Sequence, residues 1–140
     1  IYTLSLHDAL SISEGKAFTG LPVMKAVGLS GPADLPQLMD YGVAADMLLV
    51  DAKPPAGADL PGGNGLAFDW RLLVGRRFLK PWMLAGGLTP ENVAEAIRLT
   101  NARQVDVSSG VESAPGVKDM DKIARFCQAV RDHDQHRNPA

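Results

Sequence analysis

The sequence predicts an α/β protein with parallel strands, either an open sheet or part of a barrel. Three short stretches rich in apolar residues end in, or are followed by, small or acidic residues: 46–51, which ends in Asp51; 81–85, followed by Gly86 and Gly87; and 104–107, followed by Ser108, Ser109 and Gly110. Parallel strands present their carboxyl ends at one edge of a sheet or one mouth of a barrel. Polar chemistry after each strand is therefore typical of parallel α/β architecture.

The first part of the chain predicts a strand, a helix and a second strand. Residues 21–29 are apolar apart from Lys25 and indicate a buried strand. Residues 30–32 (Ser-Gly-Pro) indicate a turn that leads into a helix. The helical spacing is carried by Leu35, Leu38 and Met39, and Gly42 ends the element. The second strand is residues 46–51.

A long loop follows, at residues 52–65, and it is rich in proline and glycine. Loops of this length inside compact domains are often functional lids. Asp69 is a candidate cap for a helix that opens at Phe68 and carries Leu72, Leu73 and Val74.

Two further strand-and-helix units complete the pattern. Thr89, Pro90 and Glu91 follow the strand at 81–85 and form a helix start, with threonine as the cap and proline at the first helical position. After the strand at 104–107, Asp119 is a candidate cap for the last helix. The apolar face of that helix is Ile123, Phe126, Cys127 and Val130.

The pattern gives four parallel βα units in about 120 residues. A closed (β/α)8 barrel needs eight units and at least about 200 residues. The residues alone therefore predict either half of a barrel or a small open sheet. We expect residues 14–131 to form this unit and residues 132–140 to be a polar tail. Residues 1–13 have no clean period and resemble translated sequencing-adapter DNA, so we expect a non-native leader there.

Composition excludes several classes of protein. The chain of 140 residues is 46% hydrophobic and 21% charged, with a formal net charge of −2. These values favour neither nucleic acid nor an anionic membrane as a partner. No apolar run approaches the roughly 20 residues that span a bilayer. Cys127 is the one cysteine, which excludes an intrachain disulfide and favours a cytoplasmic setting.

A series of motifs resembles the phosphoribosylanthranilate isomerase family of tryptophan biosynthesis. The motifs occur in order at residues 25–27, 48–53, 62–70, 85–93, 106–112 and 115–119. The likeness runs from about residue 21 to residue 131. The family is a (β/α)8 TIM barrel, and the resemblance implies that this chain is its C-terminal half, strands five to eight.

The resemblance also implies what the chain lacks and what it does. The family's first strand carries a cysteine that acts as the general base, and it has no counterpart here, so a missing N-terminal half-barrel is the expected partner. Cys127 is expected to be a packed core thiol instead. The reaction is an Amadori rearrangement of a phosphosugar, and it requires no cofactor and no metal. The fragment is expected to be inactive alone.

The resemblance assigns Asp51 as the general acid, which protonates the ribose ring oxygen. Asp51 ends a strand at the mouth where barrel catalysis occurs, and donation near neutral pH requires a raised pKa. The alternative is a purely structural role, in which the Asp51 carboxylate caps a turn or pairs with Lys53. Five residues are the candidate phosphate site: Gly86, Gly87, Ser108, Ser109 and Gly110. Alternatively, these residues form two tight turns whose backbone conformation requires glycine, with no role in phosphate binding.

Two more residues are candidate substrate contacts. Asp106 alternates with two valines, shares a side with Ser108, and is implied to contact the sugar hydroxyls; it is otherwise a buried structural carboxylate. Lys25 is either a cation inside the barrel or a solvated residue at its rim.

Three rival functions remain open. The first is a phosphosugar-binding half-barrel without catalysis. The second is another phosphosugar barrel, such as indole-glycerol-phosphate synthase, against which the motifs at 62–70 and 115–119 weigh. The third is a complete four-unit open sheet, such as a flavodoxin-like receiver. Such a protein would have an acidic cluster or a flavin loop at its first strand, and this sequence has neither.

Overall fold

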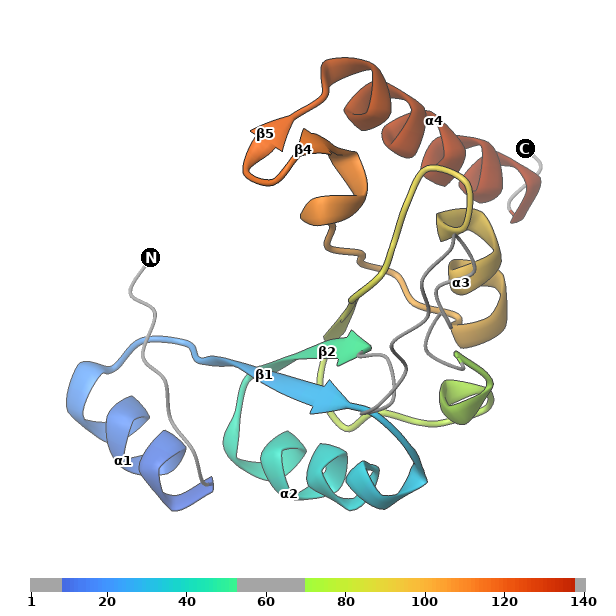
Figure 1. Ribbon diagram of the computed structural model, residues 1–140. Helices are drawn as coiled ribbons and strands as arrows, with labels where there is room; N and C mark the ends of the chain where they lie inside the picture. Colours follow the sequence, from blue (N-terminus) through green and yellow to red (C-terminus); the bar gives the residue numbers. More distant parts are fainter. Residues whose placement is uncertain (1–8, 53–69, 138–140) are drawn as a thin grey trace.

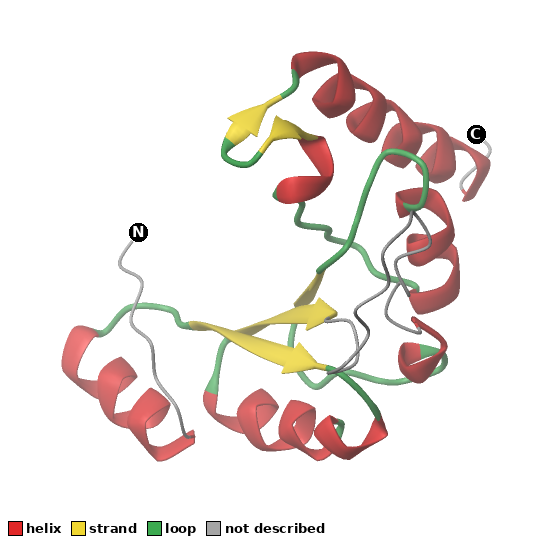
Figure 2. Cartoon of the chain, in the orientation of Figure 1, coloured by secondary structure: helices red, strands yellow, loops and turns green. Residues whose placement is uncertain are grey.

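The computed structural model describes residues 9–52 and 70–137, which form a crescent with the strands inside and the helices along the outer side (Figures 1 and 2). The elements follow in this order: α1 (Ala9–Thr19), β1 (Met24–Leu29), η1 (Pro32–Asp34), α2 (Pro36–Ala44), β2 (Met47–Ala52), η2 (Trp70–Leu73), β3 (Trp82–Ala85), α3 (Val93–Thr100), η3 (Ser109–Val111), β4 (Glu112–Ala114), β5 (Val117–Lys118) and α4 (Met120–Arg137). The elements labelled η are 3-10 helices. No helix in the described ranges is long and apolar enough to cross a membrane.

The centre of the fold is a parallel sheet in the order β1-β2-β3. Val27 of β1 pairs with Val50 of β2, and Val50 pairs with Leu84 of β3. β-branched residues favour strands because they pack well on a pleated surface. The sheet therefore forms where the sequence predicted its first three strands, with β1 beginning three residues later than expected, at Met24.

The two faces of the sheet have different environments. On the outer face, alternate residues of β1 and β2 are buried beneath helices, α2 among them: Val27, Leu29, Leu48, Val50 and Ala52. On the inner face, Met47, Leu49 and Asp51 are only half-buried. Since successive side chains of a strand alternate between faces, β2 directs its apolar anchors to the core and its carboxylate to the open side.

The predicted fourth strand is almost absent, so the fold class predicted from the sequence needs correction. Residues 104–107 contribute one bridge, between Leu84 and Val105, with hydrogen bonds from the amide of Leu84 to the carbonyl of Gln104 (2.9 Å) and from the amide of Asp106 to the carbonyl of Leu84 (2.8 Å). Ser108 then leaves the extended conformation, with φ −122° and ψ −85°. The chain continues into an antiparallel hairpin, β4-β5. The prediction of a C-terminal half of a (β/α)8 TIM barrel with four parallel βα units is therefore wrong.

The third unit also differs from the expected one. The structure shows only a one-turn 3-10 helix, η2, where a regular helix was predicted. Trp70 and Leu73 from this turn are buried in the core. The predicted cap Asp69, and nearly all of the long loop at 52–65, lie outside the described residues.

Both ends of the described chain are more structured than expected. Helix α1 includes residues 9–13, which were assigned to a leader, and Ile12 is fully buried in the core. The ammonium of Lys16 lies 2.7 Å from a carboxylate oxygen of Asp46 and joins α1 to the start of β2. At the other end, α4 continues to Arg137, through most of the predicted polar tail.

The two predicted helix caps have different outcomes. The carboxylate of Asp119 accepts a 3.0 Å hydrogen bond from the amide of Lys122, so this cap is confirmed. Helix α3 begins at Val93 rather than directly after Thr89. Thr89 still begins the turn, because its carbonyl accepts from the amide of Val93 at 3.1 Å.

Candidate active site

A cavity of about 380 Å³ opens at the carboxyl ends of β2 and β3, beside the chain that follows the bridge at Val105. Its lining residues are Leu49, Asp51, Ala52, Ala85, Gly86, Gly87, Leu88, Asp106, Val107, Ser108, Ser109 and Gly110. Seven of the eight residues proposed from the sequence lie in this cavity, and Lys25 is the exception. The polar residues at the ends of β2 and β3 and those after the bridge at Val105 thus meet at one edge, as expected for parallel strands.

Strand β2 positions Asp51. Its register partners are Gly28 in β1 and Ala85 in β3, two of the smallest residues. Small neighbours leave space around the carboxylate on the inner face of the sheet. Asp51 is half-buried, and Leu49, two residues earlier on the same face, adds an apolar wall to the cavity.

The turn after β3 requires both of its glycines. Gly86 has φ +88° and Gly87 has φ +63°, values that residues with a Cβ rarely adopt. A Cβ on Gly86 would also overlap the backbone of Ala52 at the end of β2. Gly86 therefore lets the ends of β2 and β3 approach closely. Turns without side chains also leave backbone N–H groups accessible to an anion.

Asn92 fixes this turn, and sequence reasoning gave it no site role. Its side-chain nitrogen donates to the carbonyl of Gly87 at 2.9 Å, and its side-chain oxygen accepts from the amide of Thr89 at 2.8 Å. Asn92 lies in the motif at residues 85–93. The signal that could have identified it is its position five residues after a Gly-Gly turn, at the entry to a helix.

The second turn, at residues 108–110, packs directly on the first. A Cβ on Gly110 would overlap the carbonyl oxygen of Leu88, so only glycine fits there. Ser108 and Ser109 are exposed and line the cavity. Two serines beside two glycine-rich turns provide hydroxyl and backbone N–H donors, a donor set suited to phosphate.

Asp106 enters the cavity from the segment between these turns. The bridge at Val105 and the hydrogen bond from the Asp106 amide to Leu84 hold its backbone beside β3. Asp106, Val107 and Ser108 all line the cavity, so the lining does not separate the alternate positions of this segment. Asp106 is exposed, so a ligand can reach its carboxylate.

Lys25 lies on the other face of the sheet. It pairs in register with the buried Leu48, and its ammonium lies 4.8 Å from the centre of the Tyr41 ring on α2. A cation over an aromatic face is a favourable contact. The structure therefore places Lys25 among the helix-facing residues, apart from Asp51.

Cys127 is exposed, so the prediction of a packed core thiol is wrong. The buried residue at this level of α4 is its neighbour Phe126. Successive residues of a helix point about 100° apart, and α4 buries only a narrow stripe that excludes Cys127.

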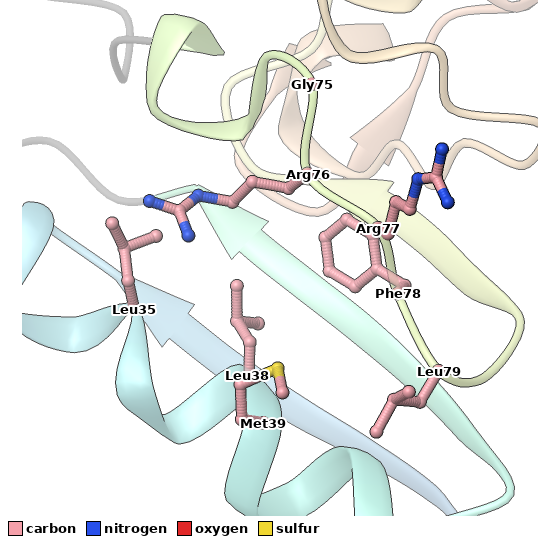
Figure 3. A pocket seen from close by; sticks show the side chains of 8 residues that line it. All are labelled: Leu35, Leu38, Met39, Gly75, Arg76, Arg77, Phe78 and Leu79. Carbon is pink, nitrogen blue, oxygen red and sulfur yellow. The ribbon is translucent and has the colours of Figure 1, made fainter.

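A second cavity, of about 250 Å³, lies between α2 and the segment that leads into β3 (Figure 3). Its lining is Leu35, Leu38, Met39, Gly75, Arg76, Arg77, Phe78 and Leu79. None of the eight candidate site residues lines it. Within the described ranges, no group of three or more His, Cys, Asp or Glu side chains is arranged to hold a metal ion.

The chain is similar to known proteins in both sequence and fold. Residues 2–129 match the family model described as N-(5'phosphoribosyl)anthranilate (PRA) isomerase. An N-(5'-phosphoribosyl)anthranilate isomerase of Paracoccus denitrificans is 71% identical over 126 residues, which are 88% of this chain and 59% of that protein.

Two solved structures have the same fold over most of the chain. The phosphoribosyl anthranilate isomerase of Thermotoga maritima matches with a TM-score of 0.69 and 38% identity, over 85% of this chain and 55% of that one. A phosphoribosyl anthranilate isomerase in complex with reduced 1-(o-carboxyphenylamino)-1-deoxyribulose 5-phosphate matches with a TM-score of 0.66 and 34% identity, over 84% of this chain and 53% of that one.

These matches also correct the predicted extent of the likeness. The family match begins at residue 2, whereas the motifs placed the likeness from residue 21. The chain spans about three-fifths of the length of the Paracoccus denitrificans relative, whereas the predicted half-barrel implied about half. The additional part includes α1, which precedes the first strand.

Proposed function

This chain belongs to the N-(5'-phosphoribosyl)anthranilate isomerase family, and from that premise we propose that its cavity takes part in the isomerisation of N-(5'-phosphoribosyl)anthranilate in tryptophan biosynthesis. The observation that carries the proposal is one cavity that contains the Asp51 carboxylate and both glycine-rich turns. The family reaction converts an aminoaldose into an aminoketose, and it needs an acid at the ring oxygen and a base at the adjacent carbon.

The seven candidate residues in the cavity each have a proposed part in this reaction. Asp51 donates its proton to the ribose ring oxygen, and the C–O bond of the ring then breaks. Gly86, Gly87, Ser108, Ser109 and Gly110 bind the phosphate through backbone N–H and hydroxyl donors. Asp106 accepts hydrogen bonds from the sugar hydroxyls. These groups bind and orient the substrate at the edge where the strands end.

Among the described residues that line the cavity, the titratable side chains are those of Asp51 and Asp106. With Asp51 as the acid and Asp106 on the sugar, neither serves as the base. We therefore propose that the group that removes the proton from carbon comes from outside the described lining. The proposed setting of the reaction is cytoplasmic, because the sequence has one cysteine and can form no intrachain disulfide.

The test follows the loss of phosphoribosylanthranilate fluorescence. One arm contains the 140-residue chain alone, and the other adds the part of the Paracoccus denitrificans relative that lies outside the alignment. Turnover in either arm supports the proposal. Asp51→Asn is expected to lower that turnover by about 10²–10⁴-fold. Lys16→Met, on α1 beside the amino end of β2, should leave it unchanged. Turnover that survives Asp51→Asn rules out the acid role.

The second candidate is a phosphosugar-binding protein without catalysis. The absence of a proposed base from the described lining favours it. Calorimetric binding of reduced 1-(o-carboxyphenylamino)-1-deoxyribulose 5-phosphate, with no turnover in either arm, would select this candidate over the isomerase.

A further inference from the structure

The hairpin β4-β5 contains residues 115–118 of the motif at 115–119 and lies next to η3 (Figure 1). Its last residue, Lys118, contacts the chain ten residues earlier. The ammonium of Lys118 donates to the carbonyl of Ser108 at 2.9 Å and lies 3.4 Å from the hydroxyl oxygen of the same residue. Ser108 is also part of the lining of the larger cavity. One cation outside the lining thus contacts both the carbonyl and the hydroxyl oxygen of a residue inside it.

Glu112 holds this lysine in place. One carboxylate oxygen lies 2.7 Å from the Lys118 ammonium, and the other accepts from the amide of Gly116 at 3.1 Å. The Glu112 side chain is 15% exposed and that of Lys118 is 46% exposed, so the pair is partly screened from water. Gly116, with φ +78°, makes the sharp turn that brings Lys118 back to Glu112.

Helix α4 anchors the same loop from the other side. The ammonium of Lys122 donates to the carbonyl of Glu112 at 2.6 Å, and the amide of Asp119 donates to the carbonyl of Val111 at 2.9 Å. The segment from Ser108 to Glu112 is therefore held at both of its ends. Lys118 is the member of this network that contacts the cavity end.

We propose that Lys118 is a positioning residue for phosphate binding, an inference that rests on the proposed function. Its ammonium donates hydrogen bonds to both the carbonyl oxygen and the hydroxyl oxygen of Ser108. A hydroxyl that accepts from a cation directs its own hydrogen elsewhere, here toward a phosphate oxygen in the cavity. The lysine also places a positive charge beside the site of a dianionic phosphate monoester.

The test compares two ligands on the 140-residue chain by calorimetry: reduced 1-(o-carboxyphenylamino)-1-deoxyribulose 5-phosphate and the same compound without its phosphate. Lys118→Met is expected to raise the Kd of the phosphorylated ligand about tenfold and to leave that of the other unchanged. Lys118→Arg, which keeps the charge and the donors, should restore most of the affinity. Lys16→Met is the matched control, since Lys16 also forms a 2.7 Å ion pair, but at the amino end of β2.

Each other outcome is decisive. Equal loss for both ligands would show general loosening of the loop, and no loss would show that Lys118 has no part in binding; both overturn the inference and leave the proposed function standing. If the unaltered chain binds neither ligand, alone or with the added part of the Paracoccus denitrificans relative, the proposed function fails and the inference fails with it. If Lys118→Met does not fold, Glu112→Gln provides the same test, because it weakens the anchor of Lys118 and should produce the same phosphate-selective loss.

Discussion

At the scale of single residues, the site depends on how closely two backbone turns approach their neighbours. Gly86 lies against the backbone of Ala52, and Gly110 lies against the carbonyl of Leu88. A methyl group at either position has no space. The lack of a side chain at Gly86 and Gly110 is therefore required for the two turns that line the cavity.

We expect Gly110→Ala to lower the free energy of unfolding by about 1–3 kcal/mol, because the turn must shift to relieve the overlap with Leu88. The same shift should weaken binding of the phosphorylated product analogue. Urea unfolding and calorimetry measure the two effects.

Gly31→Ala is the matched control for this prediction. Gly31 has an extended backbone with φ −176° and nothing within 4 Å of a Cβ. Alanine there should be neutral, or stabilising by up to about 1 kcal/mol. Equal losses for the two variants would contradict the steric argument.

Seven of the eight residues singled out from the sequence line one cavity, because strand ends can be recognised in a sequence. Asp51 and the two glycine-rich turns follow apolar runs directly, and parallel strands bring their ends together. Lys25 was harder to place, because a lysine inside an apolar run leaves its face undetermined. Cys127 was placed wrongly because it adjoins the buried Phe126, and the stripe that α4 buries is too narrow to include both.

At the scale of elements, Asp46 joins three segments that are distant in the sequence. One carboxylate oxygen lies 2.7 Å from the ammonium of Lys16 on α1, and the other accepts from the amide of Val23, just before β1, at 2.8 Å. The hydrogen bond from Lys16, and then that from Val23, lower the pKa of Asp46 below its ordinary value of 3.8. The charged carboxylate is therefore the form that stabilises the fold.

This arrangement predicts a specific pH dependence. A carboxylate whose pKa is lower in the folded state contributes stability above its ordinary pKa, and that contribution disappears as the pH falls through the folded-state value. Asp46→Asn should therefore lower the free energy of unfolding by a constant amount from pH 8 to pH 5. The difference between the two proteins should shrink below pH 3.8. Urea unfolding across this range is the measurement, and a difference that persists at the lowest pH would contradict it.

The elements themselves were predicted unevenly, for physical reasons. β1, β2 and β3 were found because apolar strands have a strong signal. The segment at 104–107 has the same signal, but its backbone turns at Ser108 after a single bridge. Helix α1 was missed because its sequence has no clean apolar period, although Ile12 is fully buried.

At the scale of the whole molecule, the two ends of the sheet differ in what they contribute. The amino end carries the contacts of Asp46 with α1 and β1, and the carboxyl end carries the cavity. Asp46, the residue before β2, and Asp51 near the end of β2 are five residues apart, or at most roughly 17 Å at about 3.3 Å per residue. Barrel proteins commonly divide stability and chemistry between opposite ends in this way.

This division predicts that changes at the two ends act independently. The double variant Asp46→Asn/Gly110→Ala should lose the sum of the two single losses in unfolding free energy, within about 0.5 kcal/mol, because the sites share no partners. Affinity for the phosphorylated product analogue should fall with Gly110→Ala and be unchanged by Asp46→Asn. Urea unfolding of the four proteins, with and without the analogue, measures both quantities. A coupling energy above about 1 kcal/mol, or an affinity that changes with Asp46→Asn, would show that β2 transmits strain from one end of the sheet to the other.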